Sequence, residues 1–519
     1  MSLRKKLLTK ANVNGYADIV PLEARIPAAR QSAKRHYGVH PYFTRRPSNV
    51  VRKYILHYSK EGDRILDPFG GSGVTAIEAF LENRIGMQND INPLANFIAH
   101  GIANLANGNL DDYRTALRSL EESCQNRLNE INHANEEQFN KLLYSLSPPL
   151  NVKLPDNSDV AYYHDLFTPR QLASLATLKD AIDRLQNDAA RNGMLLAWSA
   201  MLGKLNKTFL SAEGRAESRG GSSIFSIYRY KVAKEPVELP PWQTFLERAN
   251  NVLAAKAEID QAIELKQRTV GWRGVFEIHS RDVDDLRQEL DTPVDYIFTD
   301  PPYGGHISYL DLSTLWNNWL GLNPSMCVRE KELIVGGDLK LSESVYIARL
   351  GNSIKECVRL LKDGRWMSVV FQHWNIDYFK AILSAAADEG AELKAAISQI
   401  GDPIWSMHKK KNKESVLAGE LILTFHKSGL RKNNKTKRSF EVDKTLGAIL
   451  EGITSNKLYG EYLFNRLIIE AWKDSAIDSL DIDRTEFTGL LEGYGWRYDI
   501  DNHYWIRKRS SAPSLFDAE

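Results

Sequence analysis

Short apolar runs alternate with helix-like patterns in two separate parts of the chain. The first part predicts, in order, a buried strand at residues 64–67, a helix at 74–83 and a second strand at 84–90. The second part predicts a strand and loop at 274–286 and a buried strand that begins at residue 294 and ends at Asp300. It then predicts a helix, a turn at Asp363-Gly364 and a strand within 353–371, and a last strand at 420–428. This rhythm predicts an α/β fold with a doubly wound, Rossmann-like sheet.

Helical patterns fill the sequence between these two parts. Thr168 followed by Pro169 predicts the start of a helix over 168–185, because threonine caps helices and proline suits their first turn. Residues 194–205 predict a second, largely buried helix, and the Gly/Ser-rich residues 213–225 predict a mobile loop. We therefore expect a large helical insertion in the sheet domain.

The C-terminal tail follows a basic linker and has its own pattern. It predicts three helices and then two strands about a polar turn at Asp501-Asn502, over residues 443–453, 460–472, 483–495 and 496–508. Three helices followed by a hairpin resemble a small winged-helix-like domain.

Composition indicates where the protein works more than what it does. The chain of 519 residues exceeds what one hydrophobic core normally serves, so we expect more than one structural unit. Cys124, Cys327 and Cys357 are far apart and form no CxxC pair or Cys/His cluster, so neither a disulfide framework nor a metal site is predicted. The N-terminus lacks the apolar core of a signal peptide, and no apolar stretch reaches the ~18 residues of a membrane span. A reducing, cytoplasmic setting is expected.

Two segments are strongly basic although the formal net charge is only +1. Residues 25–53 hold eight Lys/Arg and no Asp/Glu, and residues 427–438 hold six and none. Such an excess suits the phosphate backbone of a nucleic acid, and a solvated surface or linker explains it equally well.

A glycine-rich loop lies between the first predicted strand and its helix. Asp67 and Pro68 precede Phe69, and three glycines then fall within Gly70-Gly71-Ser72-Gly73. This spacing differs from the dinucleotide fingerprint and suits one nucleoside-like ligand crossing the loop, while a carboxylate at the strand tip repels pyrophosphate and attracts an ammonium group. S-adenosylmethionine has that ammonium group, and Asp90 at the end of the next strand is placed to accept from its ribose. A structural turn with a helix-capping acid is the alternative interpretation.

A second motif, Asp300-Pro301-Pro302-Tyr303, closes a buried strand. An amino group on an aromatic ring is a poor nucleophile, because its lone pair is delocalised into the ring. A carboxylate and a backbone carbonyl that accept its two N–H bonds draw electron density toward the nitrogen and aim its lone pair at a methyl donor. Tyr303 offers a face on which a planar base stacks. Alone, such a tetrapeptide is also a common strand-end turn.

Together these motifs resemble those of the S-adenosylmethionine-dependent amino-methyltransferases of nucleic acids. DPFGGSG resembles the family's cofactor motif and DPPY its catalytic motif, over roughly 36–106 and 270–427. The resemblance implies catalytic roles for Asp300, Pro301, Pro302 and Tyr303. It implies cofactor contacts for Tyr42, Phe43, Thr44, Asp67, Pro68, Phe69, Gly70, Gly71, Ser72, Gly73, Asp90, Ile91, Asn92 and Asp282. A basic lead-in to a helix is the alternative for residues 40–55.

The resemblance also implies a division of the chain into four parts. These are a cofactor-binding half at 1–106, an insertion that is a possible target-recognition region at 107–268, a catalytic half at 269–427 and the winged-helix-like tail at 428–519. Family members with this motif order carry the target-recognition region either between the two halves or after the catalytic half. The motif order therefore does not decide between the insertion and the tail.

The same family suggests the substrate. Asp or Asn before Pro-Pro is typical of the resembling adenine N6 enzymes and Ser of the cytosine N4 enzymes, so Asp300 favours adenine. RNA guanine methyltransferases with similar motifs carry a sizeable RNA-binding domain ahead of the cofactor loop, and this chain has only about sixty residues there, so double-stranded DNA with a flipped-out base is expected. N4-cytosine methylation, RNA methylation and non-catalytic nucleic-acid binding remain open. No nuclease motif is evident, so a cleavage or defence subunit would be a separate protein.

Other residues have two interpretations each. Trp316 and Trp319 are expected in the core rather than on DNA. His306 either touches the flipped base or is a plain loop histidine, and the basic residues 406–415 form either a phosphate contact or a solvated hairpin tip. The tail segment 485–495 has two glutamates and no Lys or Arg, so protein contact is an alternative to insertion in a DNA groove.

Overall fold

The computed structural model describes residues 14–29, 34–135, 137–139, 146–211, 220–305, 307–399, 420–428, 439–459, 462–499 and 504–507. None of the helices in these ranges is long and apolar enough to cross a membrane. His306, residues 406–415 and the turn at Asp501-Asn502 lie outside the described residues.

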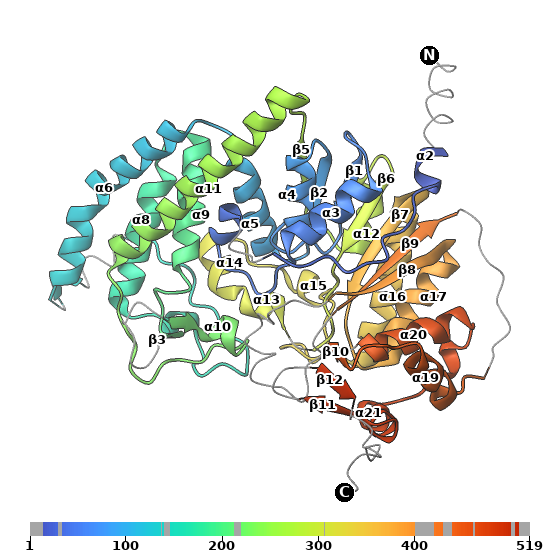
Figure 1. The fold of residues 1–519 in the computed structure, drawn as a ribbon. Coiled ribbons are helices and arrows are strands. Elements are labelled where there is room, and N and C mark those ends of the chain that lie inside the picture. Colours follow the sequence, from blue (N-terminus) through green and yellow to red (C-terminus); the bar gives the residue numbers. More distant parts are fainter. Residues whose placement is uncertain are drawn as a thin grey trace, which may run out of the picture.

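A seven-stranded, largely parallel sheet forms the centre of the molecule (Figure 1). Its strands are, in spatial order, β5 (Val275–His279), β2 (Ile85–Asn89), β1 (Arg64–Asp67), β6 (Val294–Thr299), β7 (Leu361–Phe371), β9 (Glu420–Lys427) and β8 (Ala391–Gln399). Neighbours from β5 to β7 are parallel, and β9 is antiparallel to both β7 and β8. The α/β, Rossmann-like prediction is confirmed. Because parallel strands end at the same edge, the residues that follow β1, β2, β5 and β6 meet there.

Burial explains why the central strands read as continuous apolar runs. All six residues of β6 are buried, as in a strand covered on both faces. Successive side chains point to opposite faces, so Ile65 joins the core on one side of the sheet and Leu66 the core on the other.

The predicted turn at Asp363-Gly364 is wrong in one respect. These residues lie inside β7, where the register with β6 passes from Val294↔Leu361 to Tyr296↔Trp366. Gly364 has a φ of +75°, a conformation that suits glycine in a bulge. The chain therefore bulges within the strand instead of turning before it.

Helices cover both faces of the sheet (Figure 1). One core contains residues of α3 (Ser48–Tyr58), α4 (Val74–Leu81) and α5 (Pro93–Asn104). The other contains residues of α12 (Val283–Glu289), α16 (Glu343–Leu360) and α17 (Ile376–Asp388).

The predicted insertion is helical and continues the first core. Its elements are α6 (Leu110–His133), η3 (Tyr163–Leu166), α8 (Pro169–Asp183), α9 (Asp188–Met201), β3 (Phe209–Ser211), β4 (Gly220–Ser222), α10 (Ser223–Ser226) and α11 (Pro241–Thr269). Thr168 caps α8 in a capping box with Gln171, as predicted. The described end of the expected loop at 213–225 forms β4 and α10, and residues 212–219 lie outside the described ranges.

The tail contains the predicted three helices and two final strands and continues the second core. Its elements are α19 (Val442–Glu451), β10 (Lys457–Tyr459), α20 (Tyr462–Lys473), η4 (Ile477–Ser479), α21 (Arg484–Gly493), β11 (Trp496–Asp499) and β12 (Tyr504–Arg507). Asn465 of α20 donates to the Ser398 hydroxyl of β8 at 3.2 Å. The four-part division of the chain stays a prediction.

Short helices complete the chain. They are α2 (Asn14–Ala17), η2 (Arg35–Gly38), α13 (Tyr309–Leu312), α14 (Thr314–Leu320) and α15 (Met326–Arg329). Trp316 and Trp319 of α14 are both buried, which confirms their expected place in the core.

Candidate active site

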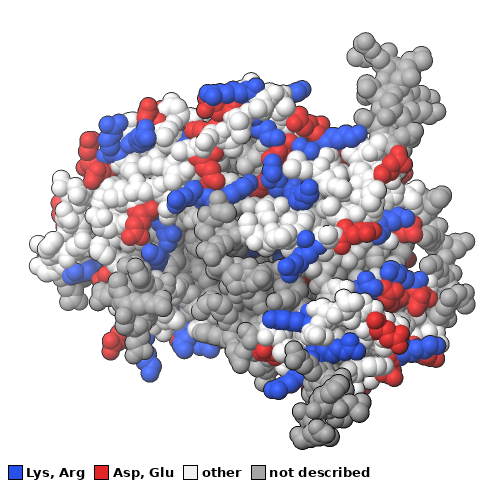
Figure 2. Space-filling model, viewed as in Figure 1, with Lys and Arg blue, Asp and Glu red and all other residues white. Residues whose placement is uncertain are grey.

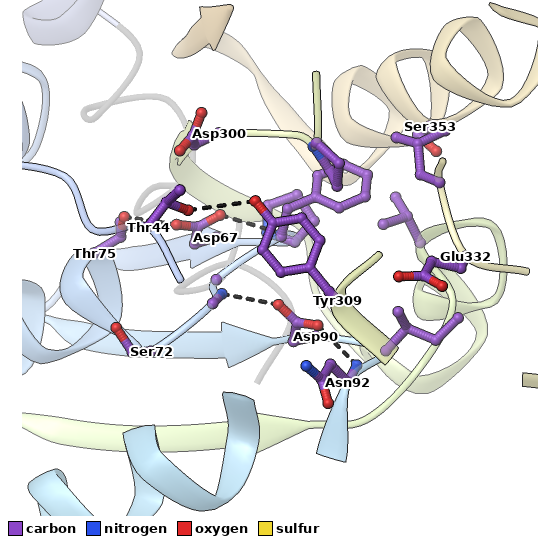
Figure 3. Close-up of a pocket in the computed structure, with 18 of the residues that line it drawn as sticks. Thr44, Asp67, Ser72, Thr75, Asp90, Asn92, Asp300, Tyr309, Glu332 and Ser353 are labelled. Carbon is purple, nitrogen blue, oxygen red and sulfur yellow. Dashed lines mark hydrogen bonds between the residues drawn. The ribbon is translucent and has the colours of Figure 1, made fainter. Parts of the chain in front are cut away.

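A large pocket opens at the edge where the parallel strands end (Figure 3). It encloses about 1120 Å³, counting its open mouth. Asp67 ends β1, Asp90 follows β2, Asp282 follows β5 and Asp300 follows β6, and all four line this pocket. Since β1 and β6 pair directly, Asp67 and Asp300 lie at adjacent strand tips and face one cleft, as expected from the sequence.

The glycines of the loop are required first by its own packing. A Cβ on Gly70 would lie 2.1 Å from the Gln88 side chain, and one on Gly73 would lie 2.6 Å from the Cβ of Ala99. Gly71 and Gly73 also have φ values of +50° and +89°. Gly70 and Gly71 line the pocket, whereas Gly73 caps α4 outside it. The expected close approach of a ligand therefore concerns the first two glycines.

Asp67 is buried in a frame of hydroxyl donors. Thr75 and Thr299 donate to its carboxylate at 2.7 and 2.8 Å, and the backbone N–H of Phe69 donates at 3.2 Å. Burial raises the pKa of Asp67 to about 7, and these hydrogen bonds oppose the rise. The carboxylate thus ties β1 to α4 and β6 while it lines the pocket.

Asp90 holds the turn of the loop from the next strand. Its carboxylate accepts from the backbone N–H groups of Gly71 at 2.9 Å and Asn92 at 2.8 Å (Figure 3). Burial raises the pKa of Asp90 to about 6, against those two hydrogen bonds. A carboxylate has about four acceptor positions, so Asp90 can accept further hydrogen bonds from a ligand.

Asp300 is paired with an arginine from a distant segment. Arg46 donates through Nε and Nη2 to the two oxygens of Asp300, at 2.5 and 2.9 Å, and through Nη2 to the Tyr303 hydroxyl at 2.6 Å. Its Nη1 forms an ion pair with Glu420 at the start of β9. Burial raises the pKa of the Asp300 carboxyl, and the charge and hydrogen bonds of Arg46 oppose that rise.

Residues of β7 and α16 hold the rest of the DPPY motif in place. The ring of Tyr303 meets Phe371 of β7 edge to face, with 5.2 Å between centroids. The Tyr346 hydroxyl of α16 donates to the carbonyl of Pro302. The motif is therefore a rigid turn whose acid faces the pocket.

The segments that carry this geometry match a known protein family. A model of the DNA methylase family of N6 and N4 enzymes matches residues 10–95 and 294–463, the two segments that carry the glycine loop and the DPPY motif. The chain belongs to the DNA methylase family.

Two further comparisons accompany this match. A modification subunit of a putative type I restriction enzyme from Vibrio vulnificus YJ016, known from a crystal structure, is similar over 80% of the methylase chain, with 11% identity and a TM-score of 0.25. The alignment spans 54% of that chain, about half of its length. A comparison with curated proteins gives no match.

The methylase brings most of the predicted site residues into one pocket. Those that line it are Tyr42, Thr44, Asp67, Pro68, Phe69, Gly70, Gly71, Ser72, Asp90, Ile91, Asn92, Asp282, Asp300 and Pro302. Four do not line it: Phe43, Gly73, Pro301 and Tyr303. Phe43 turns away from the pocket and packs on Phe225 and Trp316.

Sequence reasoning missed several lining residues. Arg45 donates from its Nε to the Ser72 hydroxyl at 2.8 Å, so the segment that carries Arg45 and Arg46 braces both the glycine loop and the DPPY motif. Tyr309 and Glu332 also line the pocket (Figure 3), and burial raises the pKa of Glu332 to about 8. Arg45 and Arg46 directly follow Thr44, a predicted cofactor contact, and this position in the sequence was the signal that could have identified them.

The N-terminal basic segment contributes part of its charge to the interior of the site. Arg45 and Arg46 point into the pocket, while Lys34 and Arg52 form ion pairs with Glu78 and Glu82. On the face shown in Figure 2, acidic and basic side chains are interspersed over the described surface. Arg45 and Arg46 therefore act within the site, whereas Arg25, Arg35 and Lys53 of the same segment are exposed.

Proposed function

We propose that this methylase transfers the methyl group of S-adenosylmethionine to the exocyclic N6 of an adenine flipped out of double-stranded DNA. One observation supports this above all: the glycine loop with Asp67 and Asp90, and the DPPY acid Asp300, line one pocket from adjacent strand tips. A methyl donor and an amine held there would be side by side.

The residues present fit the proposed cofactor. Asp90 has spare acceptor positions for ribose hydroxyls, and Asp67 is an acid for the ammonium end. Ile91 and Val283 add apolar surface for the adenine ring. When bound, this cofactor supplies an electrophilic methyl group on a cationic sulfur.

The chain's own residues would activate the target amine. Asp300 accepts one N–H of the amine, and a backbone carbonyl of the Pro301-Pro302 segment accepts the second. Both acceptors draw electron density toward the nitrogen and fix its lone pair toward the methyl group. Tyr303, held by Phe371, offers the stacking surface for the base.

The decisive experiment is tritiated methyl transfer to unmethylated genomic DNA, with total RNA as the alternative acceptor. Base analysis of the product then separates N6-methyladenine from N4-methylcytosine, and sequencing of modified bases after expression in a methylation-free host gives the recognition site. Transfer to RNA alone, or methylcytosine as the product, would contradict the proposal.

Cofactor affinity is expected to fall between pH 7.5 and pH 5: protonation of Asp90 accounts for about tenfold, and protonation of Asp67, whose pKa is raised to about 7, adds to the fall. The pKa of Asp90 is raised to about 6 in the free protein, and a ligand that donates to the carboxylate favours its ionised form, so protonation at low pH competes with binding. Isothermal titration at several pH values measures this. Asp90→Asn should remove the part of the pH dependence of cofactor affinity that comes from this side chain. An affinity that rises toward acid pH would contradict the assignment.

Tyr303→Ala is expected to lower methylation about 10–100-fold and to change the cofactor Kd less than about twofold, because base stacking contributes about 1–3 kcal/mol. Tyr303→Phe keeps the ring and is the matched control, with most activity retained. Single-turnover rates and cofactor titrations give the two readouts. Equal loss of both in Tyr303→Ala would place Tyr303 in the cofactor site instead.

The proposal extends to a biological setting of restriction–modification or phage defence. The family is one of DNA methylases and no nuclease motif is evident in the sequence, so any cleavage would be carried by a separate subunit. Co-purification from the native host, followed by a cleavage assay on unmethylated DNA, tests for such a partner.

A further inference from the structure

Arg46 forms hydrogen bonds with both polar side chains of the DPPY motif, Asp300 and Tyr303. Its guanidinium donates to both oxygens of Asp300 and to the Tyr303 hydroxyl, and it forms an ion pair with Glu420. The guanidinium carbon is 5.5 Å from the centroid of the Tyr303 ring, and the side chain is only 16% exposed. This is a planar group that directs N–H bonds to Asp300 beside the ring of Tyr303.

An exocyclic amine needs the same place. It too is planar, donates an N–H to Asp300 and lies beside Tyr303 in the proposed function. The parallel pair of hydrogen bonds from Arg46 spans both carboxylate oxygens at 2.5 and 2.9 Å, which is the fork geometry typical of arginine and carboxylate. The guanidinium therefore already donates to each oxygen of Asp300 beside the Tyr303 ring, and an amine that enters this place competes with it.

We propose that Arg46 occupies the target-amine position of the free enzyme and is released to a phosphate of the nucleic acid when the flipped base enters. This inference rests on the proposed function, since it takes Asp300 as the acceptor of the amine. Arg46 is then a positioning residue that links occupation of the active site to contact with the DNA backbone.

A phosphate is the partner that fits the released side chain. Moving Arg46 away from Asp300 and Glu420 requires another anion that accepts two parallel N–H bonds, and a phosphodiester does so. Pro47 follows Arg46 directly and precedes α3, with a φ of −60°, so the backbone is fixed there and the side chain is the part that moves. Such phosphate contacts are the ones that set a protein's register on a duplex.

Release also changes the charge around Asp300. The groups that act on its charge are Arg46, Glu420, Tyr303 and, at the end of β1, Asp67. Arg46 is the cation among them, so in its absence the burial of Asp300 and the charge of Glu420 raise the pKa of Asp300 further, against the hydrogen bond of Tyr303 alone. In the free enzyme Arg46 thus favours the ionised form of Asp300.

The first test is the salt dependence of DNA binding. The probe is a labelled duplex that contains a site methylated by the wild-type protein, in the presence of the non-reactive cofactor product. Each phosphate contact contributes about 0.9 to the slope of log K against log salt, so Arg46→Met is expected to reduce that slope by about this amount. An unchanged slope would mean that Arg46 stays on Asp300 in the complex, and it would overturn the inference.

Two further variants keep this test decisive. Arg52→Met removes a cation of the same segment that is paired with Glu82, and it should leave the slope unchanged. An equal change in both variants would show a general field effect and would also overturn the inference. If Arg46→Met does not fold, the double variant Arg46→Met/Glu420→Gln removes one cation and one anion together and should show the same loss of slope.

The second test separates the free enzyme from the complex. The acid limb of kcat/KM reports the free enzyme and that of kcat the bound complex. Arg46→Met should move the limb of kcat/KM to higher pH and leave that of kcat in place, because Arg46 has already left Asp300 in the complex. Movement of both limbs would overturn the inference while leaving the proposed function intact. Absence of methylation by the wild-type protein would overturn the proposed function and this inference with it.

Discussion

Asp300→Ala is expected to lower kcat for methyl transfer by about 10²–10³-fold, the usual effect of removing one preorganised group that stabilises developing charge. Asp300 lies at the tip of β6 with its side chain 20% exposed, and it faces the shared pocket, where the proposed target amine would lose one acceptor in the variant. The cofactor Kd should change less than about twofold, because Asp67 and Asp90 lie on other strands. Single-turnover methylation at saturating cofactor measures the loss.

Asp300→Asn is the matched variant for this prediction. It keeps the shape and one acceptor oxygen but loses the charge, and Asn occurs at this position in the resembling family, so an intermediate rate is expected. Thermal unfolding of both variants controls for stability, since Arg46 loses its partner in each. A wild-type rate of methyl transfer in Asp300→Ala would contradict the catalytic role proposed for the DPPY motif.

The parallel part of the fold was predictable because its signals are local. A strand buried on both faces reads as an apolar run, and the glycine loop follows the run directly, so β1, β6 and the turn between β1 and α4 were visible in the sequence. The start of α8 was visible for the same reason, since Thr168 and Gln171 cap it within one turn.

What the sequence did not predict depends on distant contacts. The strand β8 has a mixed pattern of burial, since it lies at the edge of the sheet and pairs only with β9, so no apolar run announces it. The bulge at Gly364 exists because β7 must keep pairing with β6 across three extra residues. Neither feature has a signal within its own segment.

The site shows the same limit. Arg46 and Asp300 are 254 positions apart, and the basic run around Arg46 gave no reason to prefer an internal ion pair over a surface contact. Phe43 is different, because the chain bends at this residue, and Phe43 packs in the core while Tyr42 and Thr44 on either side of it line the pocket.

Asp90→Ala is expected to weaken cofactor binding about 10–100-fold, since hydrogen bonds to a charged group contribute about 1.5–3 kcal/mol. The carboxylate acts twice, because it is the proposed acceptor for the ribose and it also accepts the backbone N–H bonds of Gly71 and Asn92 that shape the loop. At saturating cofactor, kcat should stay within about threefold of the wild-type value, because Asp300 is untouched.

The matched control for this last prediction is Asp284→Ala. Asp284 also lines the pocket, and its substitution removes the same charge. Because Asp284 is exposed at the start of α12, the substitution should change the cofactor Kd less than about threefold. Isothermal titration of both variants compares a specific hydrogen bond with the general field of the pocket. Equal weakening by the two substitutions would mean that the field alone attracts the cofactor, and unchanged binding in Asp90→Ala would remove the ribose assignment.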